Sequence, residues 1–182
     1  VLLFENPAVT MPRSLINFFS YFTILTNLLV AVTFTLLAFR IKTFLAHTHV
    51  LPATALYIIV VGVVYNLALR GPNTGLQILA NEIVHTFIPF LFPMYWIIFV
   101  PKYGLRWKQA FLWISYPFLY GVYTIIRGEM TGWYPYPFVN VLKVGYGTAL
   151  LNFLWICLFF FVMAFALIAV CKRSSKDYNS TL

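Results

Sequence analysis

The segment that decides the fold is Asn81–Trp96, with the sequence NEIVHTFIPFLFPMYW. Most of its residues are apolar, as in a membrane-spanning helix, yet it contains a glutamate, a histidine and two prolines. At about 3.6 residues per helical turn, one face of such a helix carries Glu82, His85, Pro89, Pro93 and Trp96. An ionisable side chain inside a membrane span is costly and seldom faces lipid. His85 is therefore a candidate functional residue.

The composition of the whole chain predicts an integral membrane protein. Of its 182 residues, 62% are hydrophobic and only 9% are charged, whereas a soluble domain has about 25% charged residues. The net charge of +8 comes from basic residues in short loops between apolar segments. That pattern is typical of membrane orientation and argues against a nucleic-acid partner. The sequence has no CxxC motif or His–Cys cluster, so it predicts no metal or other cofactor.

Five apolar segments predict an all-α, polytopic membrane helix bundle that forms a single transmembrane domain over residues 1–182. The expected spans are 15–39, 50–69, 76–100, 107–126 and 144–170, each near the ~20 residues that cross a bilayer. The run Tyr134–Phe138 contains two prolines and should form an interfacial loop. The polar tail, 174–182, is expected to be mobile. Because the chain starts at Val1, we also expect a signal peptide or a sixth span upstream of it.

The distribution of Lys and Arg predicts the orientation of the spans. The loops of one side hold eight basic residues: Arg40, Lys42, Lys102, Arg106, Lys108, Lys172, Arg173 and Lys176. The loops of the other side hold four: Arg13, Arg70, Arg127 and Lys143. The richer side should be cytoplasmic, which places the C-terminus inside.

Polar residues of all five spans then fall in the outer half of the membrane. Buried polar groups need partners, so these side chains should face one another around a shared cavity. Thr23 lies about 12 Å into its expected span and His85 about 14 Å into its own, so the two could touch if their helices are neighbours.

Each candidate residue has a structural interpretation beside the functional one. His85 is either a structural histidine or a general base, proton carrier or ligand contact; a metal-binding role is less favoured, because His47 and His49 belong to a loop on the opposite side. Thr23 either bonds back to the preceding helical turn or acts as a nucleophile, which would need an adjacent base. His85 is the base at a suitable depth.

Four further residues are candidates for orienting His85 or lining a pocket. Glu82 could orient the imidazole from one turn away, or could be an interfacial charge. Asn27 and Asn66 could join helices by hydrogen bonds or contact substrate, and Asn27 could also donate to an oxyanion. Tyr120 could belong to an aromatic pocket wall or to ordinary helix packing.

Two motifs suggest a family. The run Tyr21–Leu28 (YFTILTNL), followed by His85–Pro89 (HTFIP), resembles the paired signature of the androgen-induced-protein family and its bacterial relatives of the Pr-six-Pr type. Trp96 and the run Tyr134–Phe138 also resemble the bacterial branch. The eukaryotic members are multi-pass proteins with intramembrane threonine and histidine catalytic residues, and they hydrolyse fatty-acid esters of hydroxy fatty acids. The resemblance implies that Thr23 and His85 are the catalytic pair, and it suggests a bacterial inner membrane.

The residues and the resemblance together predict an intramembrane hydrolase of a lipid ester. Its partners would be the lipid bilayer and a fatty-acid-ester substrate that enters from the outer leaflet. The alternative is a non-catalytic lipid-binding or transport protein that uses the same outer cavity. A structural partner subunit is a third possibility, and the oligomeric state is left open.

Overall fold

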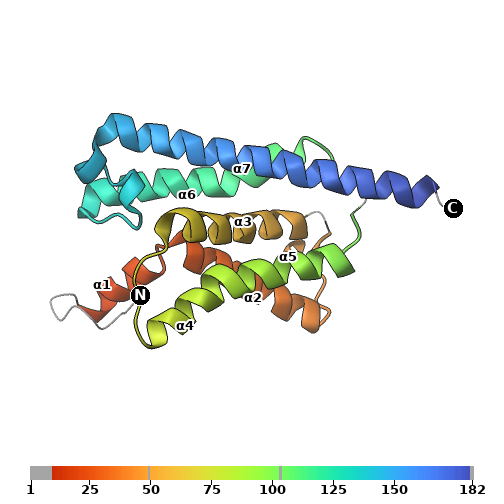
Figure 1. The fold of residues 1–182 in the computed structure, drawn as a ribbon, viewed down its shortest axis with the longest axis horizontal. Coiled ribbons are helices and arrows are strands. Elements are labelled where there is room, and N and C mark those ends of the chain that lie inside the picture. Colours follow the sequence, from red (N-terminus) through yellow and green to blue (C-terminus); the bar gives the residue numbers. More distant parts are fainter. Residues whose placement is uncertain (1–9, 49, 103, 181–182) are drawn as a thin grey trace. The chain divides into compact units, whose positions relative to one another are not determined.

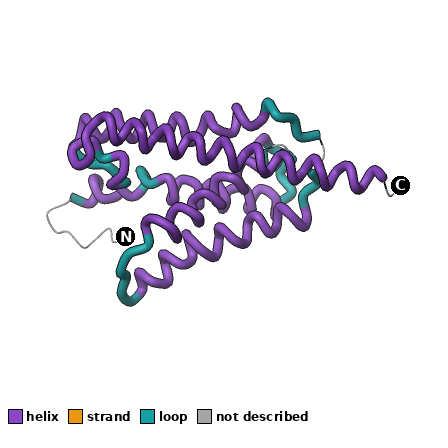
Figure 2. The backbone as a smooth tube through the Cα atoms, turned by 45° about the horizontal axis from the view of Figure 1, so that its top comes forward, coloured by secondary structure: helices purple, strands orange, loops and turns teal. Residues whose placement is uncertain are grey.

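The computed structural model describes residues 10–48, 50–102 and 104–180, with the backbone alone described for 174–180. All regular structure in these ranges is helical, as Figure 2 shows. The chain divides into two compact units, Val1–Val100 and Pro101–Leu182. The expected all-α class is therefore confirmed, whereas the single-domain boundary stays a prediction. His49, which the sequence places in a loop, lies outside the described ranges.

The first expected span, 15–39, is wrong as a continuous helix. The structure forms α1 (Met11–Phe18) and α2 (Phe22–Ala38), which are bent by 72° at the break between them. Ser20 Oγ donates to the Ile16 carbonyl at 2.6 Å, and Tyr21 has an extended backbone with ψ 131°. Thr33 and Thr35 make the same kind of bond inside α2 without a break, so the Ser20 bond accompanies the break and the extended backbone of Tyr21 marks it. Thr23 is consequently the second residue of α2 rather than a mid-span residue.

The second and third expected spans, 50–69 and 76–100, match two continuous helices of the first unit. One consists of α3 (Leu51–Val64) and the π-helical turn η2 (Tyr65–Leu69). The other consists of α4 (Leu76–Glu82), the π-helical turn η3 (Ile83–Phe87) and α5 (Ile88–Phe99). In Figure 1 the latter is a single yellow-green rod beside α2 and α3. A short 3₁₀ turn, η1 (Phe44–Ala46), lies in the loop before α3.

The second unit is a pair of helices, α6 (Gln109–Thr131) and α7 (Val141–Ser180), which contact each other along their lengths (Figure 1). The connecting Tyr-Pro run is not α-helical and ends in the 3₁₀ turn η4 (Pro137–Val139), as expected. Both helices are longer than the expected spans 107–126 and 144–170. The helix α7 continues through residues 174–180 of the expected tail, whose mobility stays a prediction. Near its start, α7 contains a kink at Gly145, whose φ of 76° favours glycine.

Within the described residues, three helices are long and apolar enough to cross a membrane: Leu51–Leu69, Leu76–Phe99 and Val141–Arg173. The bent pair α1 and α2 makes a fourth if it is one span. Many large apolar side chains on these helices are exposed, including Phe90 (63%), Phe99 (68%) and Trp155 (61%). Such exposure is typical of surfaces that face lipid or a partner rather than water. The chain therefore has the helices of a membrane protein, with three or four candidate spans.

Candidate functional site

The candidate site lies in the first unit, where the two π-helical turns η2 and η3 contact each other and α2 contacts η3. A π-helical turn inside an α-helix is rare and is frequent at functional sites. His85 lies in η3, Asn66 lies in η2, and Thr23 and Asn27 lie in the first turns of α2. The structure thus brings together four of the six residues that the sequence singled out.

His85 is buried, with 9% of its surface exposed, and it has contacts on two sides. Its Nδ1 lies 3.1 Å from the Asn81 carbonyl oxygen, and its ring stacks on Tyr65 with centroids 3.8 Å apart and planes 15° apart. A carbonyl oxygen can only accept a hydrogen bond, so this partner assigns the proton to Nδ1 of the neutral imidazole. The lone pair is then on Nε2, which is the nitrogen that could act as a base.

His85, Asn81, Asn73 and Tyr65 form a closed ring of contacts, in which each residue touches the next. Asn81 Nδ2 donates to Asn73 Oδ1 at 2.8 Å, and Asn73 Nδ2 donates to the Tyr65 hydroxyl at 3.3 Å. Because Tyr65 stacks on His85 and His85 bonds to Asn81, the four residues fix one another's orientation. Buried polar networks of this kind rigidify the groups that they contain when every member finds a partner.

Asn27 connects the turn that carries Thr23 with the turn that carries His85. Its Nδ2 donates to the Thr23 carbonyl at 2.8 Å and to the Val84 carbonyl at 3.1 Å. Thr23 itself is 8% exposed. A primary amide has two N–H donors, and both are used here. These hydrogen bonds support its role in joining helices, and an oxyanion role stays a prediction.

Asn66 makes an equivalent pair of hydrogen bonds from the opposite helix. Its Nδ2 donates to the Gly62 carbonyl at 2.9 Å and to the His85 carbonyl at 3.1 Å. The two helices approach closely beside it, because a Cβ added to Gly62 would lie 2.8 Å from Pro89 Cβ. Asn27 and Asn66 thus hold two successive carbonyls of η3.

Two other candidates have different surroundings from those expected. Glu82 forms an ion pair with Arg70 at 2.5 Å, and both side chains are about half exposed. The hydrogen-bond partner of the His85 ring is the Asn81 carbonyl rather than the Glu82 carboxylate. Tyr120 lies on α6 in the second unit, with its ring centroid 6.2 Å from that of Tyr123. A pocket role for Tyr120 stays a prediction.

The sequence reasoning missed Tyr65, Asn73 and Asn81 as members of the site. Tyr65 and Asn81 are polar residues within the expected spans 50–69 and 76–100, and Asn73 lies between those spans. The available signal is the helical spacing of Asn81 and His85, four residues apart, which places a carbonyl beside the imidazole. The stacking of Tyr65 depends on the register between two helices, which spacing along one helix does not reveal.

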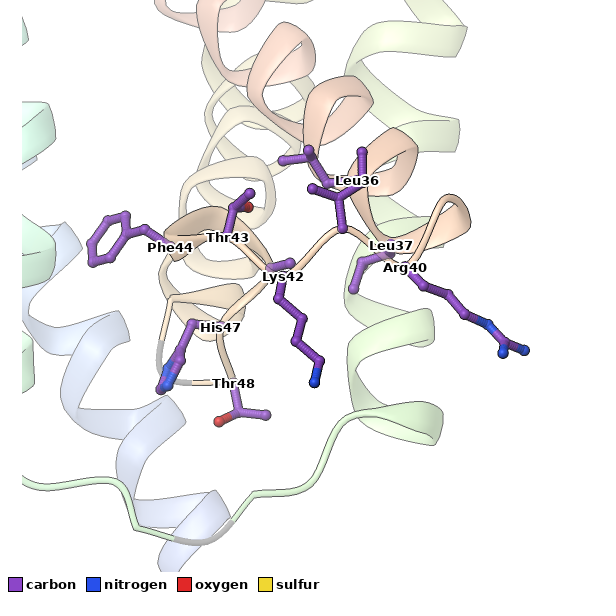
Figure 3. Close-up of a pocket in the computed structure, with 10 residues that line it drawn as sticks. Leu36, Leu37, Arg40, Lys42, Thr43, Phe44, His47 and Thr48 are labelled. Atoms are coloured by element: carbon purple, nitrogen blue, oxygen red, sulfur yellow. The ribbon is translucent and has the colours of Figure 1, made fainter.

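A cavity of about 700 Å³ lies away from this site, in the loop that joins α2 to α3. Its lining includes Arg40, Lys42 and His47, and Figure 3 shows these three side chains pointing in different directions. Arg40 adopts a left-handed backbone with φ 55°, and the N–H of Ile41 bonds to the Leu36 carbonyl. This is the pattern of a Schellman helix end, where basic side chains complement the helix dipole. Arg40 is therefore explained by helix termination, whereas Lys42 and His47 follow in the loop.

Among the described residues, no three His, Cys, Asp or Glu side chains come together as metal ligands would. Comparison of the chain with protein-family models, curated proteins and solved structures finds no match.

Proposed function

We propose that this protein is an integral membrane hydrolase that cleaves a lipid ester, with Thr23 as nucleophile and His85 as general base. Its substrate would be a fatty-acid ester of a hydroxy fatty acid, as the resemblance of the two sequence motifs suggests. The main structural support is the pair of hydrogen bonds from Asn27, which joins the helical turn of Thr23 to the residue before His85. The burial of both side chains is a second support.

The chemistry follows from the tautomer of His85. Nε2 takes the hydroxyl proton of Thr23 as Oγ1 attacks the ester carbonyl, and the imidazolium then returns that proton to the departing alcohol. The product of this half-reaction is an acyl ester on Thr23. Water, activated by the same Nε2, attacks the acyl ester and releases the fatty acid and the free threonine. Because only the neutral imidazole accepts a proton, the rate should rise with pH as His85 deprotonates.

Asn27 offers a further polar atom to a bound molecule. Its Oδ1 is buried and has no hydrogen-bond partner in the structure, and a buried acceptor without a donor costs about 1–3 kcal/mol. A water molecule or the hydroxyl of the alcohol product would satisfy it. Because an ester group has no donor, this acceptor favours the hydrolytic water or the alcohol product rather than the ester itself.

In the membrane, we propose five spans, with the C-terminus in the cytoplasm and a bacterial inner membrane as the location. The loop basic residues support this orientation. The α1–α2 pair would form the first span and α6 the fourth. The candidate site would then open toward the outer leaflet.

The test is hydrolysis of a fatty-acid ester of a hydroxy fatty acid, together with fluorophosphonate labelling, by the full chain in lipid nanodiscs. Thr23→Ala and His85→Ala should each lower the rate by roughly 100-fold or more, because general-base catalysis alone contributes about 10²–10⁴-fold. Thr35→Ala and His47→Ala are matched controls: Thr35 Oγ1 only bonds back to Ala31 at 2.9 Å, and His47 lies in the α2–α3 loop. Folded Thr23→Ala or His85→Ala protein with wild-type activity would refute the proposal.

The second candidate is a non-catalytic lipid-binding or transport protein, which the 72° break between α1 and α2 favours. Transporters often bind substrate at interrupted helices. This candidate predicts lipid binding without fluorophosphonate labelling of Thr23. Labelling that depends on His85 would exclude it.

A further inference from the structure

The helix formed by α4, η3 and α5 contains Pro89, which lies one turn after His85. In an α-helix, the His85 carbonyl would accept a hydrogen bond from the N–H of residue 89, and in a π-helical turn the Val84 carbonyl would do so. Residue 89 is proline and has no N–H. The N–H of Ile88, which would reach Val84 in an α-helix, donates instead to Ile83. Val84 thus loses both of its usual backbone donors, and His85 loses its α-helical donor.

These two carbonyls are the ones that receive asparagine side chains from the neighbouring helices. Asn27 donates to the Val84 carbonyl and Asn66 to the His85 carbonyl, both at 3.1 Å. Each asparagine is itself held by its second N–H, which bonds to the carbonyl four residues earlier in its own helix. Carbonyls freed by a proline within a span need replacement donors, since lipid supplies none.

We propose that Asn27 and Asn66 are positioning residues for His85: they donate to the two carbonyls that Pro89 and the π-helical register leave without a backbone N–H, and thereby hold η3 in that register. The register sets the direction of the His85 side chain relative to α2 and to Tyr65. Gly62 is required for the arrangement, because its missing Cβ lets α3 approach Pro89 and places Asn66 within reach of η3. The kinetic consequence rests on the proposed hydrolase function, whereas the structural consequence does not.

The effects of substitutions at Asn66 and Pro89 should be coupled. Asn66→Leu leaves the His85 carbonyl without a donor only as long as residue 89 is proline. Pro89→Ala restores an N–H, which reaches that carbonyl when the turn returns to the α-helical register. The effect of Asn66→Leu should therefore be large in the native background and small in the Pro89→Ala background, which a double-mutant cycle measures directly.

The experiment uses the full chain in nanodiscs with ¹⁵N-labelled histidine. The sequence has three histidines, so His85 can be assigned by substitution of the other two. We expect the wild type to show an Nδ1-protonated imidazole. Asn66→Leu should disturb this signal and lower kcat by roughly tenfold or more with little change in KM, because misplacement of a catalytic group by about 1 Å can cost 10²-fold. In the Pro89→Ala background, adding Asn66→Leu should change kcat by less than about twofold.

Asn152→Leu is the matched control, because Asn152 Nδ2 also donates to a backbone carbonyl, that of Phe138 at 2.8 Å, but lies in α7. It should leave the His85 signal unchanged and show no coupling to Pro89. Equal effects of Asn66→Leu in the two backgrounds would overturn the proposal, as would a wild-type His85 signal in both Asn66→Leu and Asn27→Leu. If the wild type hydrolyses no ester, the hydrolase assignment fails, but the ¹⁵N signals still test the positioning role.

Discussion

In the first unit, side-chain amides reach backbone carbonyls inside a helix, whereas in the second unit polar side chains fasten a loop. Asn27 and Asn66 bond to Val84 and His85 in the middle of a candidate span. In the second unit, Glu129 accepts hydrogen bonds from the hydroxyls of Tyr134 and Tyr146, both at 2.7 Å, where α6 turns toward α7.

The helices of the second unit pack through aromatic side chains. Phe111 contacts Phe161 with centroids 5.1 Å apart, and Phe118 contacts Phe153 at 5.6 Å. Such contacts join two apolar helix faces without hydrogen bonds, and α6 contains no π-helical turn. The comparison shows that the π-helical turns of the described residues coincide with polar contacts between helices.

The largest expected loss of stability follows from adding a methyl group at Gly62, where α3 crosses the helix that contains Pro89. Gly62→Ala places a Cβ 2.8 Å from Pro89 Cβ, and the helices must separate. We expect a loss of about 1–3 kcal/mol in the free energy of unfolding, as for other overpacked sites. Gly147→Ala in α7 is the control, since its Cβ meets nothing within 4 Å. Thermal unfolding in nanodiscs measures both, and equal stability of the two variants would contradict the close approach of α3.

Removing one hydrogen bond from the ring of contacts around His85 should lower the stability by a smaller amount. Tyr65→Phe keeps the stacking on His85 but removes the hydroxyl that accepts from Asn73. We expect a loss of about 0.5–1.5 kcal/mol in unfolding free energy. We also expect reduced protection of the Asn81–His85 backbone in hydrogen exchange. Unchanged exchange in this segment would show that Asn73 and Asn81 orient His85 without Tyr65.

The ion pair of Glu82 with Arg70 should contribute less, because both side chains are about half exposed. Exposed ion pairs contribute about 0–1 kcal/mol. Glu82→Gln should therefore leave the unfolding free energy within that range, and ester hydrolysis within roughly threefold. A far larger loss of activity with unchanged stability would restore the expected relay between Glu82 and His85.

The smallest effect concerns the loop of the second unit and depends on pH. Hydrogen bonds from Tyr146 and Tyr134 lower the pKa of Glu129 below its ordinary value of 4.5. A carboxyl with a lowered pKa in the folded state stabilises the fold above its unfolded pKa, and this contribution is lost as the pH falls through the folded pKa. Burial and the neighbouring Glu129 raise the pKa of Tyr134 to about 12, so Tyr134 stays a donor throughout this range.

The measurement is the melting temperature of wild type and Glu129→Gln between pH 6 and pH 3. The difference between the two should be greatest above about pH 4.5 and should shrink on acidification. It should be small, because the carboxylate is exposed to solvent. A difference that grows on acidification would mean that the protonated carboxyl, rather than the carboxylate, holds the loop.

The sequence by itself determined the helical class and the helices at 51–69 and 76–99, because apolar runs of sufficient length depend only on local composition. It also singled out His85, Thr23, Asn27 and Asn66, since polar residues are conspicuous in apolar segments. It failed at the break between Phe18 and Phe22, where no proline or glycine marks the bend and Tyr21 takes an extended backbone.

Only the tertiary structure decided which carbonyls the two asparagines reach and which ring stacks on His85. Pro89 shows in the sequence that this helix lacks a backbone N–H donor. The side chains that donate in its place come from helices distant along the chain. Their identity depends on the approach of α3 at Gly62 and on the register between neighbouring helices. Both are properties of packing, because a side-chain donor on one helix bonds to a carbonyl on another only when packing brings the two atoms to about 3 Å.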